Sequence, residues 1–281
     1  MRIVFILIFL FNVAYGQQQM FHSNNAGVTY DVDAQAYFTA LEASVSPTTA
    51  QKNAINTLIV NLKANGVWAK SPAIYFPVWN NTAADKWNMK DPRDLDAAYR
   101  LTFHGTITHS TGGLTGDGST GYADTKLTPS NVGTQNSSAM SFYSRTNTSA
   151  SNYREMGVIN NYNTFISILD PSSNTVYGIN GNSESANAIV SDSRGLFTVS
   201  RTGASAVAFY KNGSSISTST LASTGRDAIN IYILGVNAGS LNNPTVRQCA
   251  LAAIHEGLNS TEAADFYTEV QALMTAFGIN V

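Results

Sequence analysis

The feature that most constrains this chain is a series of short segments in which apolar and polar residues alternate, each bounded by turn-forming residues. In the segment 99–105, Tyr99, Leu101 and Phe103 fall on one side of an extended backbone, and polar side chains fall on the other. A repeat of two residues is the pattern of a strand with one buried face. Many such segments separated by Gly, Asn, Ser or Pro predict an all-β sandwich or barrel.

Two of these segments carry further information. Asn212-Gly213 is the strongest hairpin signal, because a type I′ turn needs a positive φ at both central residues and this pair tolerates it. The segment 229–236 is apolar at most positions, which predicts a strand buried on both faces. The expected strands are 73–78, 99–105, 122–127, 140–146, 154–159, 164–169, 175–179, 196–201, 206–210, 229–236 and 246–255.

Helical periodicity is found only towards the two ends of the chain. We expect Asp33 to cap a helix over 34–44, and Ser46 to cap a second helix that Gly66 ends. The apolar stripe of the second helix indicates packing against the β body, and the alternative is a face for a partner or for oligomerisation. Near the C-terminus, Asn259 or Ser260 can cap a helix over 260–277.

The first residues resemble a secretory signal peptide. Arg2 supplies a positive charge, Ile3–Val13 is an apolar run, and Ala14-Tyr15-Gly16 offers small residues before Gln17. The run is shorter than the roughly 20 residues that span a bilayer. A hydrophobic anchor or an N-terminal core strand is the alternative. The expected organisation is a signal peptide or anchor at 1–16, a helical segment at 17–70 and a sandwich at 71–281 that includes the helix 260–277.

The composition indicates a surface of neutral hydrogen-bonding groups. Charged residues make up 12% of the chain, and the formal net charge is −2. Without a cluster of Lys and Arg, the chain lacks the electrostatic footprint of a nucleic-acid-binding protein, so we expect no nucleic-acid partner. Cys249 is the single cysteine. It lies in a strand-like run, which indicates a buried, inert thiol.

Several segments carry a resemblance to a known superfamily. The run 90–101 and the run 118–125 look like a block found in bacteriophage structural proteins with a concanavalin A-like (laminin-G-like) lectin domain. The hairpin at 208–213 and the passage from strand to helix at 257–267 are similar to features of the same lectin and glucanase superfamily. The resemblance covers roughly residues 30 to 281. It implies a mainly β fold, a jelly-roll β-sandwich with N-terminal helices and a C-terminal helix.

The resemblance also implies a function. It suggests a structural or recognition component of a phage virion, such as a tail, spike or capsid-surface protein. The implied ligand is a host-surface or envelope glycan, and the implied partners are other virion proteins or further copies of the chain. The expected location is the virion surface, or outside the cell if the signal peptide operates. A secreted bacterial carbohydrate-binding lectin is the alternative.

No motif indicates catalysis, and we predict that the protein is not an enzyme. A glycan-cleaving enzyme of the same fold is the rival, and it needs two carboxylates facing each other across a cleft. The pattern Gly116-x-Gly118-x-x-Gly121 matches a dinucleotide-binding motif, but without a βαβ unit it indicates a turning loop. The remaining acids of the strand region are isolated: Glu155, Asp170, Glu184, Asp192 and Asp227.

No cofactor or metal is expected. Asp91, Asp94 and Asp96 are clustered around Pro92, where the chain enters a turn, and turn and capping roles are the simplest interpretation. A calcium site is the alternative, although no EF-hand spacing supports it. His104 and His109 flank an expected hairpin and could be neighbours across it.

Carbohydrate binding is the remaining chemistry that the sequence supports. Sugar sites stack aromatic rings on pyranose faces beside neutral hydrogen-bonding groups. One loop region supplies both, and three further residues could lie close by in the expected sheet. The alternative is that the two tryptophans hold this loop over the core. The candidate glycan-binding residues are Trp79, Asn80, Asn81, Trp87, Asn88, His104, Tyr122 and Tyr143.

Overall fold

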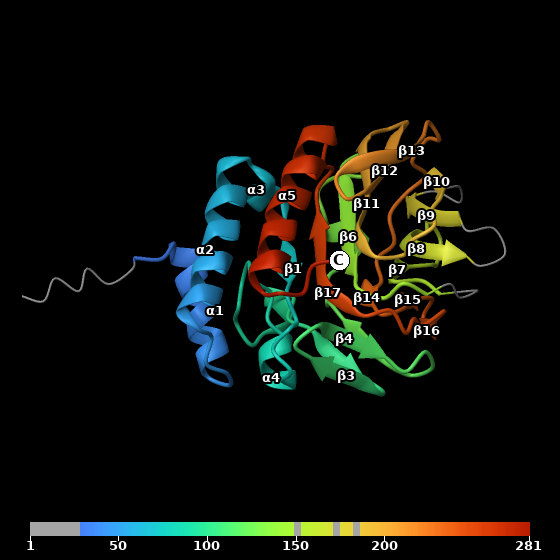
Figure 1. Cartoon of the computed structure of the whole chain (residues 1–281). Helices are drawn as coiled ribbons and strands as arrows, with labels where there is room; N and C mark the ends of the chain where they lie inside the picture. Colours follow the sequence, from blue (N-terminus) through green and yellow to red (C-terminus); the bar gives the residue numbers. More distant parts are fainter. Residues whose placement is uncertain (1–28, 149–152, 171–174, 182–185) are drawn as a thin grey trace, which may run out of the picture.

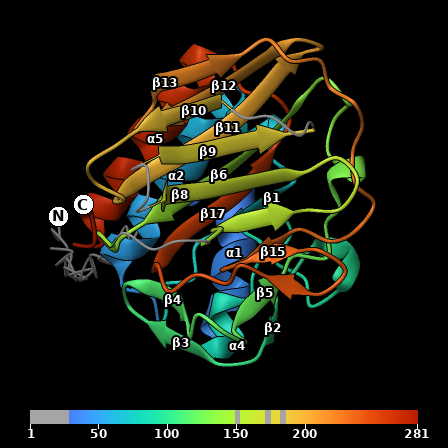
Figure 2. The same ribbon diagram turned by 90° about the vertical axis from the view of Figure 1, so that its right-hand side faces the viewer.

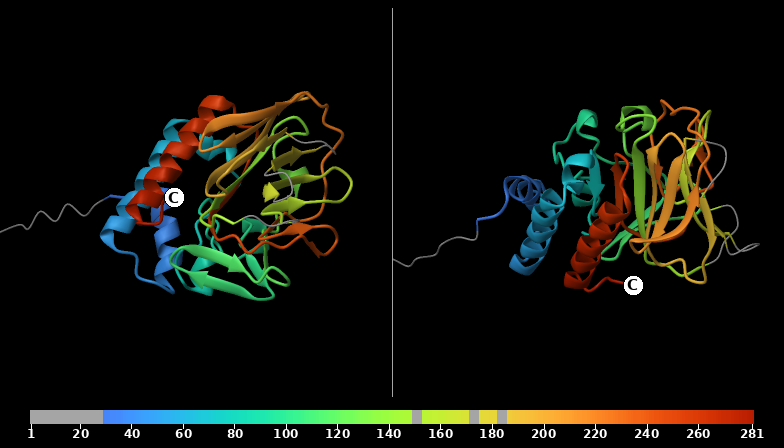
Figure 3. Two further views of the ribbon diagram at one scale, coloured as in Figure 1. Left: turned by 45° about the vertical axis from the view of Figure 1, so that its right-hand side comes forward. Right: turned by 90° about the horizontal axis from the view of Figure 1, so that it is seen from above.

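The computed structural model describes residues 29–148, 153–170, 175–181 and 186–281. The expected signal peptide or anchor at 1–16 lies outside these ranges. The described chain forms three layers, a layer of helices and two β-sheets, which follow one another in Figure 1 and in the view from above in Figure 3. The expected mainly β sandwich, with N-terminal helices and a C-terminal helix, is confirmed. Within the described ranges, no helix has both the length and the apolar character to cross a membrane.

The helical layer is built from three long helices. They are α1 (Val32–Glu42), α2 (Thr49–Ala64) and α5 (Ser260–Ala276). Two short helices follow. Helix α3 (Val67–Lys70) comes directly after α2, and α4 (Thr82–Asp85) lies between the strands β1 (Ala73–Tyr75) and β2 (Thr102–His104).

The helix caps differ in part from those expected. Asp31, not Asp33, caps α1, because its carboxylate accepts the backbone N–H of Asp33. Thr48 rather than Ser46 caps α2, since a capping box needs Gln or Glu three residues later and Gln51 stands there. The expected box between Asn259 and Glu262 at the start of α5 is confirmed.

Sheet A lies between the helices and sheet B, and it has the strand order β13-β12-β11-β6-β17-β4-β3, with β1 paired to β17. The pairs in this sheet are antiparallel, and Asn212-Gly213 forms the expected turn between β12 and β13 with positive φ at both residues. Its strands are β1 (Ala73–Tyr75), β3 (Ile107–Ser110), β4 (Gly113–Gly116), β6 (Ser138–Ser144), β11 (Gly195–Gly203), β12 (Ala206–Lys211), β13 (Ser214–Ser219) and β17 (Cys249–His255).

Sheet B has the strand order β10-β9-β8-β7-β14-β5-β2, and the small pair β15–β16 joins it through β7. Its strands are β2 (Thr102–His104), β5 (Tyr122–Asp124), β7 (Met156–Val158), β8 (Thr164–Asp170), β9 (Thr175–Asn180), β10 (Ala186–Ile189), β14 (Tyr232–Ile233), β15 (Val236–Asn237) and β16 (Leu241–Asn242). His104 is therefore in sheet B and His109 in sheet A, so these residues do not face each other across one hairpin.

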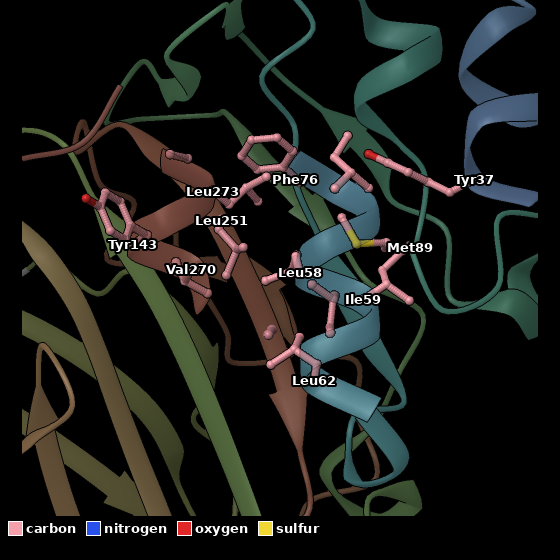
Figure 4. Packing of buried hydrophobic residues seen from close by; sticks show 14 of the residues in the cluster. Tyr37, Leu58, Ile59, Leu62, Phe76, Met89, Tyr143, Leu251, Val270 and Leu273 are labelled. Atoms are coloured by element: carbon pink, nitrogen blue, oxygen red, sulfur yellow. The ribbon is translucent and has the colours of Figure 1, made fainter. Parts of the chain in front are cut away.

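Two hydrophobic cores separate the layers. One lies between the helices and sheet A, where Leu58, Val270 and Leu273 of the helices meet Tyr143 and Leu251 of the sheet (Figure 4). The other lies between the two sheets and includes the inward side chains of both. Strands β6 and β17 are buried at every position, because each face of sheet A borders one of these cores. Cys249 is buried in the core between the sheets, as expected.

Candidate functional site

Among the residues that the structure describes, no helix covers the outer face of sheet B, which forms a broad surface of the sandwich (Figure 2). Side chains of Ala123, Ile233 and Ile166 point from this sheet into the core between the sheets. Their neighbours in sequence point the other way, because successive strand residues alternate between faces. Polar and aromatic side chains at these outward positions form the candidate site.

The site is built around a row of three aromatic rings from neighbouring strands, which we call the aromatic row: His104 of β2, Tyr122 of β5 and Tyr232 of β14. The imidazole of His104 stacks on the Tyr122 ring, with 4.7 Å between centroids and 11° between planes. The rings of Tyr122 and Tyr232 are 4.3 Å apart and tilted by 30°. All three side chains are half-buried, so part of each ring faces solvent.

The strand register explains why these rings meet. His104 is directly opposite Tyr122 in the β2–β5 pair. Tyr232 is opposite Asp124, two residues beyond Tyr122 on the same face of β5. Because β2 is the edge strand of sheet B, no further strand lies beyond His104, and one face of its ring is not stacked by a strand neighbour.

Asp124 anchors the polar part of the site. Its carboxylate accepts hydrogen bonds from the Lys126 backbone N–H at 2.8 Å and from the Lys126 ammonium at 2.9 Å. The amide of Asn230 donates to the same carboxylate at 3.2 Å. Thr102 is opposite Asp124 in the strand pair, so its hydroxyl lies on the same face. Aromatic and hydrogen-bonding groups thus adjoin one another on one surface.

The electrostatics of the site keep the phenol of Tyr232 protonated. Burial, together with the hydrogen bond and proximity to Tyr122 and the negative charge of Asp124, raises the pKa of Tyr232 to about 12. A protonated phenol can donate as well as accept a hydrogen bond. The row can therefore offer hydroxyl hydrogen bonds at its rim in addition to apolar ring surface.

A loop organised by Asp117 borders the His104 end of the row. The carboxylate of Asp117 accepts the backbone N–H groups of Ser119, Thr120 and Gly121, at 2.7 to 2.9 Å. These bonds and the bond from the Thr120 hydroxyl lower the pKa of Asp117, which stays ionised. The expected turning loop after Gly116 is confirmed, and it joins β4 of sheet A to β5 of sheet B.

The predicted tryptophans lie elsewhere, in the core between the helices and sheet A. Trp79 packs edge-on against Phe76 and Phe277, and its indole N–H donates to the Tyr37 hydroxyl at 3.3 Å. Trp87 is 9% exposed, and the Lys86 ammonium lies 4.4 Å from its ring centroid. These contacts match the alternative interpretation, in which the two tryptophans hold a loop over the core.

Two of the three predicted asparagines make structural contacts, and the third is exposed. Asn81 caps α4 by accepting the N–H groups of the next turn, and Asn80 is exposed with a φ of 51°. Asn88 is buried, and its side-chain oxygen accepts the Ile74 N–H at 3.0 Å. Its amide donates to backbone carbonyls on both sides. Asn88 therefore joins neighbouring backbone segments inside the fold and is not a surface residue.

Tyr143 is also distant from the aromatic row. It lies on β6 of sheet A, is fully buried, and faces the helices (Figure 4). Its hydroxyl donates to Gln271 of α5 at 3.0 Å and accepts the backbone N–H of Val281 at 3.1 Å. Of the eight residues proposed from the sequence, only His104 and Tyr122 are thus in direct contact on the open face of the sandwich. Glycan binding by any of them stays a prediction.

The sequence reasoning missed Tyr232. The segment 229–236 was expected to be buried on both faces, and this is wrong at Tyr232, which is half-buried beside Tyr122. The inward face of the segment, Ile231 and Ile233, is buried as the alternation requires. The signal that was available is the phenol hydroxyl, since a Tyr among isoleucines often places its polar end in water.

The clustered aspartates after Lys90 are occupied by ion pairs. Asp91 binds Arg93, Asp94 binds Lys86 and Arg100, and Asp96 also binds Arg100. A hollow of about 520 Å³ lies between α1 and this segment. Its charged groups are engaged in these ion pairs, or, for Lys90, in a hydrogen bond to the Trp68 carbonyl and a cation–π contact with the Trp68 ring. Over the residues that the structure describes, no group of three or more His, Cys, Asp or Glu could hold a metal ion.

Three buried acids link neighbouring elements of the fold. Glu155 is fully buried and binds Arg247 at 2.7 Å. Asp227 accepts the backbone N–H groups of Asn161 and Tyr162. Asp85, whose side chain is inaccessible, binds His109 at 2.7 Å and so joins α4 to β3. Each carboxylate is engaged with donors from neighbouring elements.

A buried serine and histidine also lie together, beneath α5. The imidazole of His255 is 2.6 Å from the Ser71 hydroxyl and 3.3 Å from the Ser141 hydroxyl. Burial lowers the pKa of His255 to about 3, so the ring is neutral. Ser71, Ser141 and His255 are all inaccessible to solvent. This cluster of three residues therefore links sheet A to the helical layer and is not placed to contact a substrate.

Comparisons with known proteins add little beyond the fold class. No family model and no curated protein sequence matches the chain. A Trypanosoma rangeli sialidase bound to 2,3-difluorosialic acid is 10% identical, with a TM-score of 0.46 over 77% of this chain and 39% of the sialidase. Domain 4 of an extracellular arabinanase from Geobacillus stearothermophilus, bound to arabinotriose, is 17% identical, with a TM-score of 0.44 over 70% of this chain and 98% of that domain.

A third similar structure comes from botulinum neurotoxin type C, in a study of its interaction with two ganglioside molecules. It is 16% identical, with a TM-score of 0.48 over 74% of this chain and 53% of the toxin chain. This chain therefore spans about two-fifths of the sialidase and about half of the toxin chain. Likeness at this level carries no argument about function, which must be argued from the site itself.

Proposed function

We propose that this protein is a non-enzymatic recognition protein displayed at a surface, and that it binds glycan through the outer face of sheet B. The observation that carries the proposal is the half-exposed aromatic row of His104, Tyr122 and Tyr232 beside hydrogen-bonding groups. This is the combination that sugar recognition uses, because C–H faces of a pyranose pack on rings while its hydroxyls need donors and acceptors.

The rigidity of the row supports the proposal. The rings stand on strands whose register is fixed by the sandwich core below, and they support each other by stacking. A preorganised surface loses little side-chain entropy when a ligand binds. Asn230 and Asp124 are likewise held in place before any ligand arrives.

The proposal that the protein is not an enzyme rests on how its acids are engaged. Glycoside hydrolysis needs one carboxyl group to deliver a proton and a second to act from the opposite side of the sugar. Asp124, the carboxylate beside the row, is bound to Lys126 and Asn230. The rival, a glycan-cleaving enzyme, would release reducing ends from mixed polysaccharides, and we expect none.

A glycan array with single-site variants tests the proposal. We expect the protein to retain a subset of glycans, and Tyr122→Ala or Tyr232→Ala to weaken that binding by about tenfold, in keeping with the loss of one stacked ring. Tyr30→Ala is the matched control, because Tyr30 is also half-buried but contacts Phe38 in the helical layer. Binding that survives both sheet B variants, or that Tyr30→Ala abolishes, would refute the site.

The place of display is a finer part of the proposal. The similarity of residues 90–101 and 118–125 to phage structural proteins favours a virion component, such as a tail, spike or capsid-surface protein. A secreted bacterial lectin is the second candidate, which the apolar run Ile3–Val13 favours. N-terminal sequencing of the purified protein distinguishes them: cleavage before Gln17 supports the secreted lectin, and an intact N-terminus in purified particles supports the virion protein.

A further inference from the structure

We propose that the aromatic row selects uncharged glycans and disfavours those with carboxylate or sulfate groups. This inference rests on the proposed glycan-binding function and specifies its ligand. It follows from the state of the charged groups around the row, each of which is paired, engaged elsewhere or negative.

The nearest cation is Lys126, and it is neutralised within the site. Its ammonium lies 2.9 Å from Asp124, whose carboxylate it shares with the Asn230 amide. An acidic sugar would have to compete with this carboxylate for the ammonium. The free energy gained from a new pair between Lys126 and the sugar would be offset by the loss of the existing pair between Lys126 and Asp124. The Asp124–Lys126 pair therefore offers dipolar hydrogen bonding but no net positive charge.

Arg100 lies two residues before β2, and two carboxylates bind it. Its guanidinium is 2.8 Å from Asp94 and 3.0 Å from Asp96, and it also donates to the hydroxyl of Thr102 at 3.3 Å. Thr102 is on the same face of the sheet as His104. Arg100 thus borders the site, but the charge around it is balanced by its own acidic partners.

Asp117 adds an uncompensated negative charge at the edge of the row. Its loop adjoins the connection that follows β2, because the Asp117 N–H donates to the Thr106 carbonyl and the Thr106 N–H donates to the Thr120 hydroxyl. The carboxylate is exposed and its hydrogen bonds come from hydroxyl and backbone N–H groups. A fixed negative charge at this place repels an anionic ligand, which is a means of specificity that does not require contact.

The cation farther along the outer face is Arg154, and it is engaged with protein groups. Its guanidinium lies 4.7 Å from the centroid of the Phe165 ring and donates to the side-chain oxygens of Asn242 and Asn243. Phe165 is on β8, separated from β14 by β7. Arg154 therefore stands apart from the three rings and is already used to cover one aromatic side chain.

The test is an array of matched oligosaccharides, each neutral glycan printed beside the same glycan with one terminal sialic acid or one sulfate. We expect the neutral member to bind about tenfold more tightly, because an anion at the row must give up water without finding a free cation. The preference should shrink as salt rises from about 0.02 to 0.5 M, since repulsion by the exposed Asp117 is screened.

Two conservative variants sharpen the test. Asp117→Asn keeps an oxygen for the three backbone donors but removes the charge, and Asp124→Asn leaves Lys126 without its carboxylate. Each should improve binding of the acidic member by about two- to threefold at low salt, the size expected when one charge near the protein surface is removed. Neither should weaken the neutral member to the extent of Tyr122→Ala.

The outcomes separate this inference from the proposed function. Equal or tighter binding of the acidic members, with the binding still lost in Tyr122→Ala, would overturn the preference for neutral glycans and leave the glycan site intact. Binding of neither member at any position of the array would overturn the glycan function and this inference together. Circular dichroism of Asp117→Asn and Asp124→Asn would establish that both variants are folded.

Discussion

The outer faces of the two sheets differ in what covers them. The outer face of sheet A is apolar and lies under α2 and α5, whereas the outer face of sheet B carries half-exposed rings and hydrogen-bonding side chains with no helix over them. Both sheets share the same inner core. The comparison indicates that the outer face of sheet A contributes to stability by packing against the helices. The outward side chains of sheet B are not constrained by such packing and are available for recognition.

The largest expected effect comes from removing a ring beneath the helices. Phe266 of α5 is fully buried and packs edge-on against His255 at 4.7 Å. Phe266→Ala should lower the free energy of unfolding by about 3–5 kcal/mol, because it deletes buried surface and leaves a cavity. Urea denaturation measures this change. A loss below about 1 kcal/mol would mean that α5 contributes little to the covered face, and the contrast between the two faces would fail.

The next effect depends on pH, through the buried His255. Burial lowers its pKa to about 3 in the folded protein, against about 6.5 when the chain is unfolded. Below pH 6.5 the unfolded chain therefore binds a proton that the folded protein does not, and stability falls as pH decreases. The slope approaches about 1.4 kcal/mol per pH unit, or roughly 2 kcal/mol between pH 6.5 and pH 5.

The variant His255→Asn isolates this contribution. Asp31, Asp91 and Asp192, whose pKa values are lowered, lose stability only as pH falls through and below about 4, outside the window of interest. Urea denaturation at several pH values from 7 to 5 should therefore give a flatter dependence for His255→Asn. His104→Asn, on the uncovered face, is the matched control. An unchanged slope in His255→Asn would show that the buried imidazole is not the group responsible.

A smaller effect concerns the attachment of α5 to sheet A. The side-chain oxygen of Asn259 accepts the backbone N–H of Glu262 at 3.0 Å, and the carboxylate of Glu262 accepts the backbone N–H of Asn259 at 2.9 Å. Asn259→Ala removes the cap and should cost about 1 kcal/mol in the free energy of unfolding. Asn259→Ser, which retains a capping oxygen, is the control. If both variants lose the same amount, the capping bond is not the cause.

The sequence predicted the sandwich because the strand signals were local. The Asn212-Gly213 turn depends on neighbours along the chain and is confirmed. The alternation in 99–105 is confirmed in part: Leu101 and Phe103 face the core, but the strand is limited to Thr102–His104 and Tyr99 has a φ of 59°. The site depends on contacts between distant strands, which alternation cannot supply. Whether Tyr122 meets His104 or Tyr143 is decided by which sheet each strand joins, and that order follows from packing across the whole domain.

The second limit was burial. Trp79 and Trp87 had the side chains of a sugar site, and a single sequence does not show that the helices would cover them. Tyr232 had the same chemistry in a segment that is apolar at most positions, and it faces outward because its neighbours Ile231 and Ile233 face the core between the sheets. The structure brings the rings of two predicted residues, His104 and Tyr122, into contact, and their binding of glycan stays a prediction. The order of the layers determines which aromatic residues reach the surface.

The smallest expected change in stability lies on the uncovered face, in Tyr122→Ala. Tyr122 contacts His104 and Tyr232, and cross-strand aromatic pairs contribute roughly 0.2–1 kcal/mol each, so the loss of both pairs should lower the free energy of unfolding by about 1 kcal/mol. Its effect on glycan affinity should be larger than its effect on stability, which is the reverse of what Phe266→Ala is expected to show. Urea denaturation and glycan titration of the same two preparations measure both quantities. A loss of 3 kcal/mol or more in Tyr122→Ala would mean that the open face is a structural layer like the covered one, and the division between the two faces of the sandwich would not hold.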